Sequence, residues 1–500
     1  MDASVATALV VLAMVFGFYM AWNIGANDLA NAMGTSVGSG ALTLMGAVLL
    51  AGSMEFMGAF LVGPHVSETV RKGIVDLAIF ADDPNGPTEL ALGMLAALLA
   101  AGVWLQVASY FGWPVSTTHS IVGAIVGFGV IYGGFDAVNW VGEGGITAVL
   151  RGKGGVASIV ASWVVSPVLA GTIAFLTFRL VVLEAIFHRP DPVEAARRLT
   201  PYIVFCVLVV LMLVLGFKGL KPFWKNFGLN PTDSLPLTVS LGAAFGGGLI
   251  GALISGRLAR SIVPADAGRA AELRGFYVAR ALSKAIMHLR RVEYAAPVAI
   301  RERAVVVLGN AQRLLDDVRR SADEGDERSA YQDVERIFIY LQILSAGFVA
   351  FAHGANDVAN AIGPLSVVVQ IAQTGAIPTS SAVPMWALAL GGFGIVLGLA
   401  TWGWRVIQTI GKRITELTPS RGFCAEFAAA TTILLASVYK LPISTTHTLV
   451  GAVLGVGLAR GLGALNLVMV RDIAVSWMVT IPAGAGLAIV FYGALRLALL

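Results

Sequence analysis

The sequence of 500 residues predicts an all-α polytopic membrane protein, with about 12 transmembrane segments in two inverted-topology repeats and a soluble helical insert. Three observations lead to this prediction: long apolar runs, two duplicated motifs, and one segment that concentrates the charged residues. Only 13% of the residues are charged, whereas soluble globular proteins carry about 25%. The composition therefore excludes an ordinary soluble protein.

The apolar runs predict the membrane spans. Hydrophobic residues make up 57% of the chain, and the mean hydropathy is +0.80. A run of about 20 such residues crosses a hydrocarbon core of about 30 Å. Such runs lie at roughly 5–24, 41–63, 90–110, 116–134, 155–187, 201–217, 236–255, 337–353, 383–404, 424–439, 445–465 and 472–495. Gly and Pro interrupt several of them, so some runs could be half-helices or re-entrant hairpins.

The charged segment, residues 256–336, predicts a domain outside the membrane. It holds 15 Lys/Arg and 12 Asp/Glu, with apolar residues at helical spacing. We expect two or three amphipathic helices that join the two halves, with a membrane-surface or regulatory role as the alternative. Lys/Arg bias places this insert in the cytoplasm and both termini outside. The predicted divisions are repeat 1 (1–190), connecting helices (191–255), the insert (256–336) and repeat 2 (337–500).

Two motifs occur twice, in the same order. The sequence GANDLANA at 25–32 returns as GANDVANA at 354–361, and PVSTTH at 114–119 returns as PISTTH at 442–447. Seven predicted spans separate the two copies of the first motif, which is an odd number, so the copies enter the membrane from opposite sides. Inverted repeats of this kind let transporters open a central site to either side in turn.

The first motif places polar side chains on one helix face, because residues three and four apart are neighbours. These residues are Asn27, Asp28 and Asn31 in one copy and Asn356, Asp357 and Asn360 in the other. An Asp within a span costs about 2.5–3.5 kcal/mol, and neither motif contains Lys or Arg. We therefore expect a bound cation as the partner, since such oxygens suit hard cations. Interhelical hydrogen bonding is the alternative role for the Asn residues.

The second motif predicts an anion site at two helix starts. Pro precedes a helix start, and Ser or Thr caps the free N–H groups that follow. The hydroxyls are those of Ser116, Thr117, Thr118, Ser444, Thr445 and Thr446. With the helix dipole they offer donors to an oxyanion, although capping alone is the simpler alternative. His119 and His447 follow directly, and we expect them to be packing or helix-orienting residues.

Two further carboxylates, Glu55 and Glu426, also lie in apolar runs. The alignment of the two repeats does not place them at equivalent positions. We expect both to take part in binding or coupling the cation, with a structural or interfacial role as the alternative. Cys206 and Cys424 lie in apolar segments as well, and they give no sign of a disulfide framework.

Together, the motifs describe a transporter and not an enzyme. Hydroxyl and amide donors hold an anion less tightly than Arg does, so co-bound cations can supply the missing charge, and affinity falls when they leave. An intramembrane hydrolase using Ser, His and Asp would need a single asymmetric constellation, which two complete copies do not favour. A passive anion channel remains the alternative from another class.

The two GAND motifs and the two Ser-Thr-Thr-His segments, with GTSVGSGALTL at 34–44 and GPL at 363–365, resemble the signature repeats of the inorganic phosphate transporter (PiT) family. The resemblance implies symport of inorganic phosphate into the cell, driven by sodium in many members and by protons in others. Sulfate and metal-phosphate complexes are the implied alternative substrates. The paired GAND motifs and glutamates look more like the sodium-coupled branch.

Carried onto this sequence, the resemblance implies two sets of site residues. Phosphate would bind to Asp28, Asn31, Ser116, Thr117, Thr118, Asp357, Asn360, Ser444, Thr445 and Thr446. Together with the helix-face and apolar-run arguments above, the resemblance predicts that sodium binds to Asn27, Asp28, Asn356, Asp357, Glu55 and Glu426. Ile24 stands where the second copy has His353, so His353 is assigned no symmetric role.

We expect no resident cofactor, with sodium as the coupling ion. The expected partners are inorganic phosphate, sodium ions and the lipid bilayer of the plasma membrane, and no nucleic acid is expected. A homodimer is left open as the oligomeric state.

Overall fold

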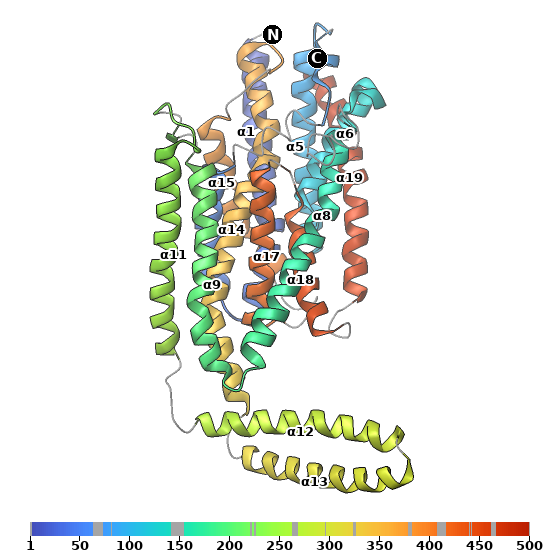
Figure 1. The fold of residues 1–500 in the computed structure, drawn as a ribbon. Helices are drawn as coiled ribbons and strands as arrows, with labels where there is room; N and C mark the ends of the chain where they lie inside the picture. Colours follow the sequence, from blue (N-terminus) through green and yellow to red (C-terminus); the bar gives the residue numbers. More distant parts are fainter. Residues whose placement is uncertain are drawn as a thin grey trace. The chain divides into compact units, whose positions relative to one another are not determined.

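The computed structural model describes residues 3–63, 74–81, 83–141, 155–220, 223–224, 227–262, 269–295, 297–323, 327–378, 383–407, 417–439, 441, 443–461 and 467–499 (Figure 1). Within these residues the structure is helical, and β pairing is limited to an isolated bridge between Val75 and Val138. The predicted all-α fold class is therefore confirmed.

Most of the α-helices coincide with the predicted apolar runs, whereas two lie in the charged insert. In chain order they are α1 (Ala3–Ile24), α2 (Ala30–Gly38), α3 (Leu44–Leu61), α5 (Gly86–Tyr110), α6 (Thr117–Gly133), α8 (Gly155–Leu176), α9 (Pro192–Val214), α11 (Ser234–Ile262), α12 (Arg269–Ala295), α13 (Val298–Asp323), α14 (Glu327–Thr374), α15 (Met385–Trp402), α17 (Pro419–Val438), α18 (Thr445–Arg460) and α19 (Leu467–Leu499). Short 3₁₀ or π segments lie between some of them, including η1 (Gly25–Leu29).

Ten helical segments of the described chain are long and apolar enough to cross a membrane, so this is a multi-pass membrane protein. Two of the twelve predicted spans are shorter. Helix α6 has 17 residues and α18 has 16. At 1.5 Å per residue their lengths are about 26 and 24 Å, less than the hydrocarbon thickness of about 30 Å. The count of twelve spans therefore stays a prediction.

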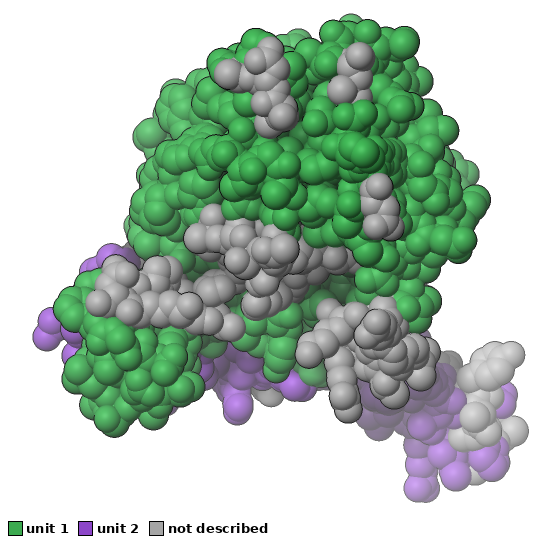
Figure 2. Space-filling model, turned by 90° about the horizontal axis from the view of Figure 1, so that it is seen from above, with its two compact units in different colours: residues 1–178, 207–247, 340–500 green, residues 179–206, 248–339 purple. Residues whose placement is uncertain are grey.

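The chain divides into two compact units, coloured in Figure 2. Unit 1 comprises residues 1–178, 207–247 and 340–500, and unit 2 comprises residues 179–206 and 248–339. Unit 2 contains the charged insert, whose helices α12 and α13 pack on each other through a small core of their own. Its members are Ala279, Ile286, Leu308 and Leu315. The predicted division at residues 190, 255 and 336 stays a prediction.

Unit 1 contains both copies of both motifs, and its helices pack reciprocally between the repeats. Helix α6 of the first repeat packs on α19 of the second, and α18 of the second packs on α8 of the first (Figure 1). Likewise, α5 contacts α19 while α17 contacts α8. Reciprocal contacts of this kind arise when two equivalent halves meet across a twofold axis. Their opposite directions in the membrane stay a prediction.

Candidate functional site

The two copies of the first motif lie on helices that approach their neighbours closely. The first copy begins at η1, a turn of π-helix between α1 and α2, whereas the second lies within the continuous helix α14. A Cβ atom on Gly25 would lie 1.8 Å from the carbonyl oxygen of Ile395, and one on Gly354 would lie 2.2 Å from that of Glu55. Only glycine permits this contact, so the motif glycines bring each carboxylate-bearing helix against the opposite repeat.

The two Ser-Thr-Thr segments begin helices inside the protein, as predicted. Ser116 is the N-cap of α6, and its Oγ accepts a hydrogen bond of 3.2 Å from the backbone N–H of His119. Ser444 caps α18 in the same way, with a distance of 3.1 Å to the N–H of His447. Both serines are buried. Their hydroxyls act as helix caps here, which was the alternative to a role in anion binding.

Within each repeat, the first Thr of the helix start donates to the motif carboxylate. Thr117 Oγ1 lies 2.7 Å from Asp28 Oδ2, and Thr445 Oγ1 lies 2.6 Å from Asp357 Oδ2. The backbone N–H of Thr117 also points to Asp28 Oδ2, at 3.4 Å. Both carboxylates are buried, so these hydrogen bonds lower the cost of holding a charge away from water.

The second Thr of each helix start reaches across to the other repeat. Thr446 donates to Asp28 Oδ1, and Asn360 donates to Thr118 Oγ1 over 3.2 Å. Thr118 donates to the carbonyl oxygen of Ile443 at 2.9 Å, while Thr446 approaches that of Val115 at 3.3 Å. These contacts bring Asp28 and Thr118 of the first repeat together with Asn360 and Thr446 of the second.

His353 corrects the expectation that the motifs contain no basic partner for their carboxylates. Its Nε2 lies 2.8 Å from Asp357 Oδ2, and its Nδ1 lies 2.8 Å from Glu55 Oε1. That expectation considered only Lys and Arg, and so overlooked an imidazole one helical turn before Asp357. The spacing of four residues was the available signal. The pairing also joins Glu55 to the central site.

Glu426 lies in a separate polar cluster, and within the described residues its hydrogen-bond donors are three hydroxyl groups and one amide. Its Oε2 accepts from Ser345 at 2.6 Å. Its Oε1 accepts from Thr35 at 2.7 Å, from Gln342 at 3.2 Å, and from Ser36. Sequence reasoning missed these four residues. Thr35 and Ser36 follow the first motif within two helical turns, which was the only local signal.

The Asn residues at the third position of the motifs make matched structural contacts. Asn27 donates to Ser109 Oγ at 2.9 Å and to the carbonyl oxygen of Trp113 at 3.1 Å. Asn356 makes the equivalent bonds to Ser437 and Leu441, at 3.2 and 3.3 Å. The amide groups thus tie the motif to the ends of α5 and α17, the helices that come before the Ser-Thr-Thr segments. Within the part of the chain that the structure describes, the side-chain oxygen of Asn27 has no hydrogen-bond partner. The side chain of Asn31 lies outside the described part of the chain.

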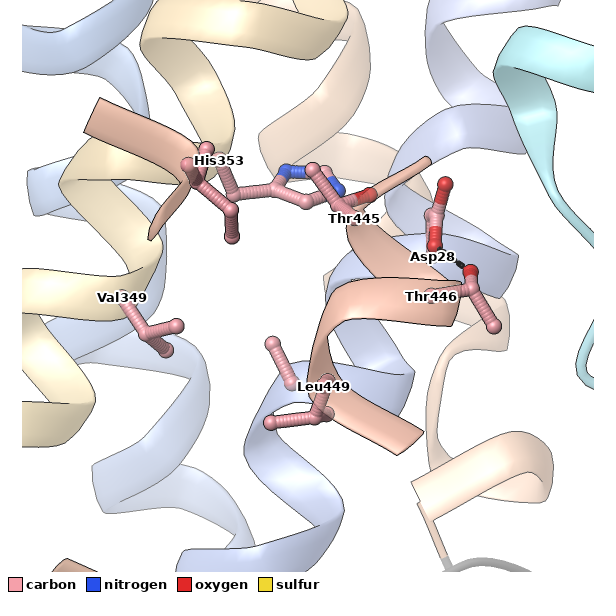
Figure 3. A pocket seen from close by; sticks show the side chains of 8 residues that line it. Asp28, Val349, His353, Thr445, Thr446 and Leu449 are labelled. Atoms are coloured by element: carbon pink, nitrogen blue, oxygen red, sulfur yellow. Dashed lines mark hydrogen bonds between the residues drawn. The ribbon is translucent and has the colours of Figure 1, made fainter. Parts of the chain in front are cut away.

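A small cavity lies between the repeats at this site (Figure 3). Its volume of about 10 Å³ is close to what one water molecule needs. The lining residues are Asp28, Ala32, Val349, His353, Ile433, Thr445, Thr446 and Leu449. In Figure 3, Asp28 and Thr446 meet on one side of this space and His353 reaches in from α14. The cavity is therefore too small for a ligand larger than water.

The site offers two kinds of chemistry. Asp28, His353 and Asp357 present ligand atoms that all lie within 4.8 Å of one another, as a cation site requires. The starts of α6 and α18 add hydroxyl donors and the positive ends of two helix dipoles, which suit an anion. In this conformation the hydroxyls of Thr117, Thr445 and Thr446 donate to the carboxylates.

Comparison with known proteins gives concordant results. Residues 24–488 match the model of the Phosphate transporter family. The Arabidopsis thaliana protein named inorganic phosphate transporter 2-1, chloroplastic, is 43% identical over 480 residues, which cover 96% of this chain and 70% of that protein. A protein of Chlamydia pneumoniae is 41% identical over 98% of both chains. A solved structure titled "The sodium-dependent phosphate transporter" matches with a TM-score of 0.72 and 36% identity, covering 98% of this chain and 99% of that one.

Proposed function

Since the chain belongs to the phosphate transporter family, we propose that it is a secondary active symporter that brings inorganic phosphate into the cell together with sodium ions. The observation that carries this proposal is the position of Asp28, which accepts hydrogen bonds from Thr117 of its own repeat and from Thr446 of the other. A buried carboxylate at this junction can respond to a cation and to movement of either half.

Phosphate binds at the starts of α6 and α18 in this proposal. The donors are the hydroxyls of Thr117, Thr118, Thr445 and Thr446, supplemented by Asn360 and, as implied by the family resemblance, Asn31. The two carboxylates stand beside these donors and repel an anion. Phosphate therefore needs cations at Asp28 and Asp357 before it can remain there.

Sodium ions supply that charge and also free the donors. A sodium ion beside Asp28 and Asp357 neutralises the oxygens that now accept from Thr117 and Thr445. The hydroxyls can then turn from the carboxylates to the phosphate oxygens. The side-chain oxygens of Asn27 and Asn356 complete the cation ligands, since carboxylate and amide oxygens suit small hard cations. Each ligand thus raises the affinity for the other, and this is the coupling.

Glu426 is proposed to hold a further sodium ion. Its carboxylate is buried among Thr35, Ser36, Gln342 and Ser345, and all of these carry oxygen atoms. An unpaired carboxylate at membrane depth is costly, and a cation in this cluster would offset that cost. Glu55 differs, because His353 already contacts it, so we assign Glu55 to the central site.

The closed cavity supports an alternating-access cycle. Space for one water molecule between the repeats means that phosphate can enter only after the halves move apart. Because the repeats contact each other reciprocally, an equivalent movement opens the site to either side. The plasma membrane is the proposed location, and a homodimer remains a prediction.

Proton coupling is the second candidate, and His353 is the observation that favours it. An imidazole between Glu55 and Asp357 becomes a cation on protonation and could take the place of a sodium ion. Sulfate remains the alternative cargo, because hydroxyl donors and helix dipoles suit either oxyanion.

Uptake of radiolabelled phosphate into proteoliposomes tests the proposal. We expect accumulation above equilibrium with an imposed inward sodium gradient, little accumulation with a proton gradient alone, and weak competition by excess sulfate. Accumulation with the proton gradient alone would support proton coupling instead. Downhill phosphate flux that does not depend on the sodium gradient or the proton gradient would indicate a channel and overturn the proposed symport.

A further inference from the structure

His119 and His447, which the proposed mechanism does not use, meet at the junction of the repeats. Their ring centroids lie 4.3 Å apart, and the rings are nearly perpendicular at 84°. Both side chains are buried. Because the two residues occupy the same position in the two copies of the motif, this is a contact of a residue with its own repeat equivalent.

Two tryptophans enclose the histidine pair. Trp163 of α8 lies 3.7 Å from His119, centroid to centroid, and Trp477 of α19 lies 3.4 Å from His447. His447 Nδ1 also lies 3.4 Å from the carbonyl oxygen of Trp163. The order Trp163, His119, His447, Trp477 forms a continuous set of four rings, to which each repeat contributes one Trp and one His.

This aromatic set is joined directly to the proposed phosphate donors. His119 follows Thr118, and His447 follows Thr446. The backbone N–H of each His is the group that the capping serine holds. A shift of either ring therefore moves the first turn of its helix, together with the Thr hydroxyl that precedes it. Thr446 donates to Asp28, so the movement would reach the carboxylate.

The helices that carry the rings are themselves held across the repeats. Helix α6 packs on α19, which carries Trp477, and α18 packs on α8, which carries Trp163. Trp163 and Trp477 are thus held in place at the two ends of the four rings. The contact between His119 and His447 lies at the middle. From this arrangement we infer that His119 and His447 are positioning residues that set the spacing between the two helix starts, and thereby the affinity for phosphate. The inference rests on the proposed function.

Phosphate uptake by reconstituted His119→Ala, His447→Ala and the double variant tests it. We expect each single variant to raise the KM for phosphate by about threefold to tenfold, the range that corresponds to losing one aromatic contact, with less change in kcat. The two effects should be similar in size because the positions are equivalent. The effect of the double variant should be smaller than the sum of the two single effects, because both substitutions remove the contact between His119 and His447.

Two further variants separate positioning from packing. His119→Phe keeps a ring at the contact and should restore a KM near that of the wild type. Phe128→Leu alters a buried ring on the same helix, packed on Phe80 and Tyr492, and should lower the melting temperature without changing the KM. A normal KM in the His119→Ala and His447→Ala variants, or independent effects in the double variant, would overturn the inference. Absence of wild-type uptake would instead refute the proposed function.

Discussion

Thr446 of the second repeat donates a hydrogen bond to Asp28 of the first, although 418 residues separate them. The same carboxylate accepts from Thr117 of its own repeat. Asp28 therefore lies where the two halves of the protein meet, and any relative movement of the halves changes its hydrogen bonds. This relationship is the basis for expecting that ion binding and movement are coupled at Asp28.

Replacing either motif carboxylate should abolish concentrative uptake. Asp28→Asn and Asp357→Asn keep the size of the side chain but remove the charge that holds the cation. Hydrogen bonds to charged groups contribute about 1.5–3 kcal/mol each, so we expect uptake to fall on the order of a hundredfold. Radiolabelled phosphate uptake measures this in protein whose thermal unfolding is unchanged. Asp136→Asn, at an exposed position, is the control, and wild-type rates in the motif variants would contradict the site.

Phosphate uptake should depend on the hydroxyl groups of Thr117 and Thr445 and not on the volume of these side chains. Thr117→Val and Thr445→Val remove the donors to Asp28 and Asp357, and each should reduce uptake by about tenfold, the effect of roughly 1.4 kcal/mol. Thr117→Ser and Thr445→Ser should keep most of the activity. Thr200→Val removes a buried hydroxyl that bonds only within its own helix, and it should not alter uptake. Equal rates for the Val and Ser variants would rule out a role for the hydroxyls.

His353 should make the sodium requirement depend on pH. A protonated imidazole 2.8 Å from Asp357 and from Glu55 competes with a cation for the same carboxylates. Acidification should therefore raise the sodium concentration for half-maximal uptake in the wild type, because protonation adds positive charge at the site. In His353→Gln, which has no imidazole to protonate, that concentration should depend less on pH than it does in the wild type. Identical pH profiles in the two proteins would exclude His353 from the competition.

Glu426 should affect sodium dependence more than phosphate affinity. Within the described residues, its hydrogen bonds come from Thr35, Ser36, Gln342 and Ser345, and not from the central site. Glu426→Gln lowers the ligand charge, which weakens cation sites, so we expect half-maximal sodium to rise about tenfold with little change in phosphate KM at saturating sodium. Sodium activation curves measure this.

Glu89 provides the matched control for that measurement. It is also buried, but Arg496 lies 2.9 Å away and Tyr492 donates to it at 2.6 Å. Glu89→Gln should lower thermal stability, because it removes the charge that pairs with Arg496, while the sodium activation curve stays unchanged. A larger sodium effect at Glu89 than at Glu426 would argue against a cation beside Glu426.

Removing the insert should spare transport. Helices α12 and α13 pack on each other through their own core, so residues 270–325 can be replaced by a short Gly-Ser linker without exposing that core. We expect uptake within about twofold of the wild type. If a well-folded deletion protein fails to take up phosphate, the insert has a role beyond joining the halves.

Local pattern predicted the residue types at the site and the helices that carry them. Asp28 and Asp357 stood out because a carboxylate within an apolar run is costly, and the second copy of the motif made a coincidental pattern implausible. The role of His353 was missed, because a His in an apolar helix is usually a packing residue and does not bind a ligand. Its contact with Glu55 joins residues 298 positions apart, and no local pattern encodes that distance.

The sequence by itself determined the fold class, the repeat and the face of each helix that carries polar groups, because helical periodicity and the cost of burying charge act over a few residues. Only the tertiary structure decided which of those faces meet. It joined Thr446 to Asp28, His353 to Glu55, and Thr35 to Glu426. These pairings depend on how glycine-containing helices from the two repeats pack together, and packing is a property of the whole chain.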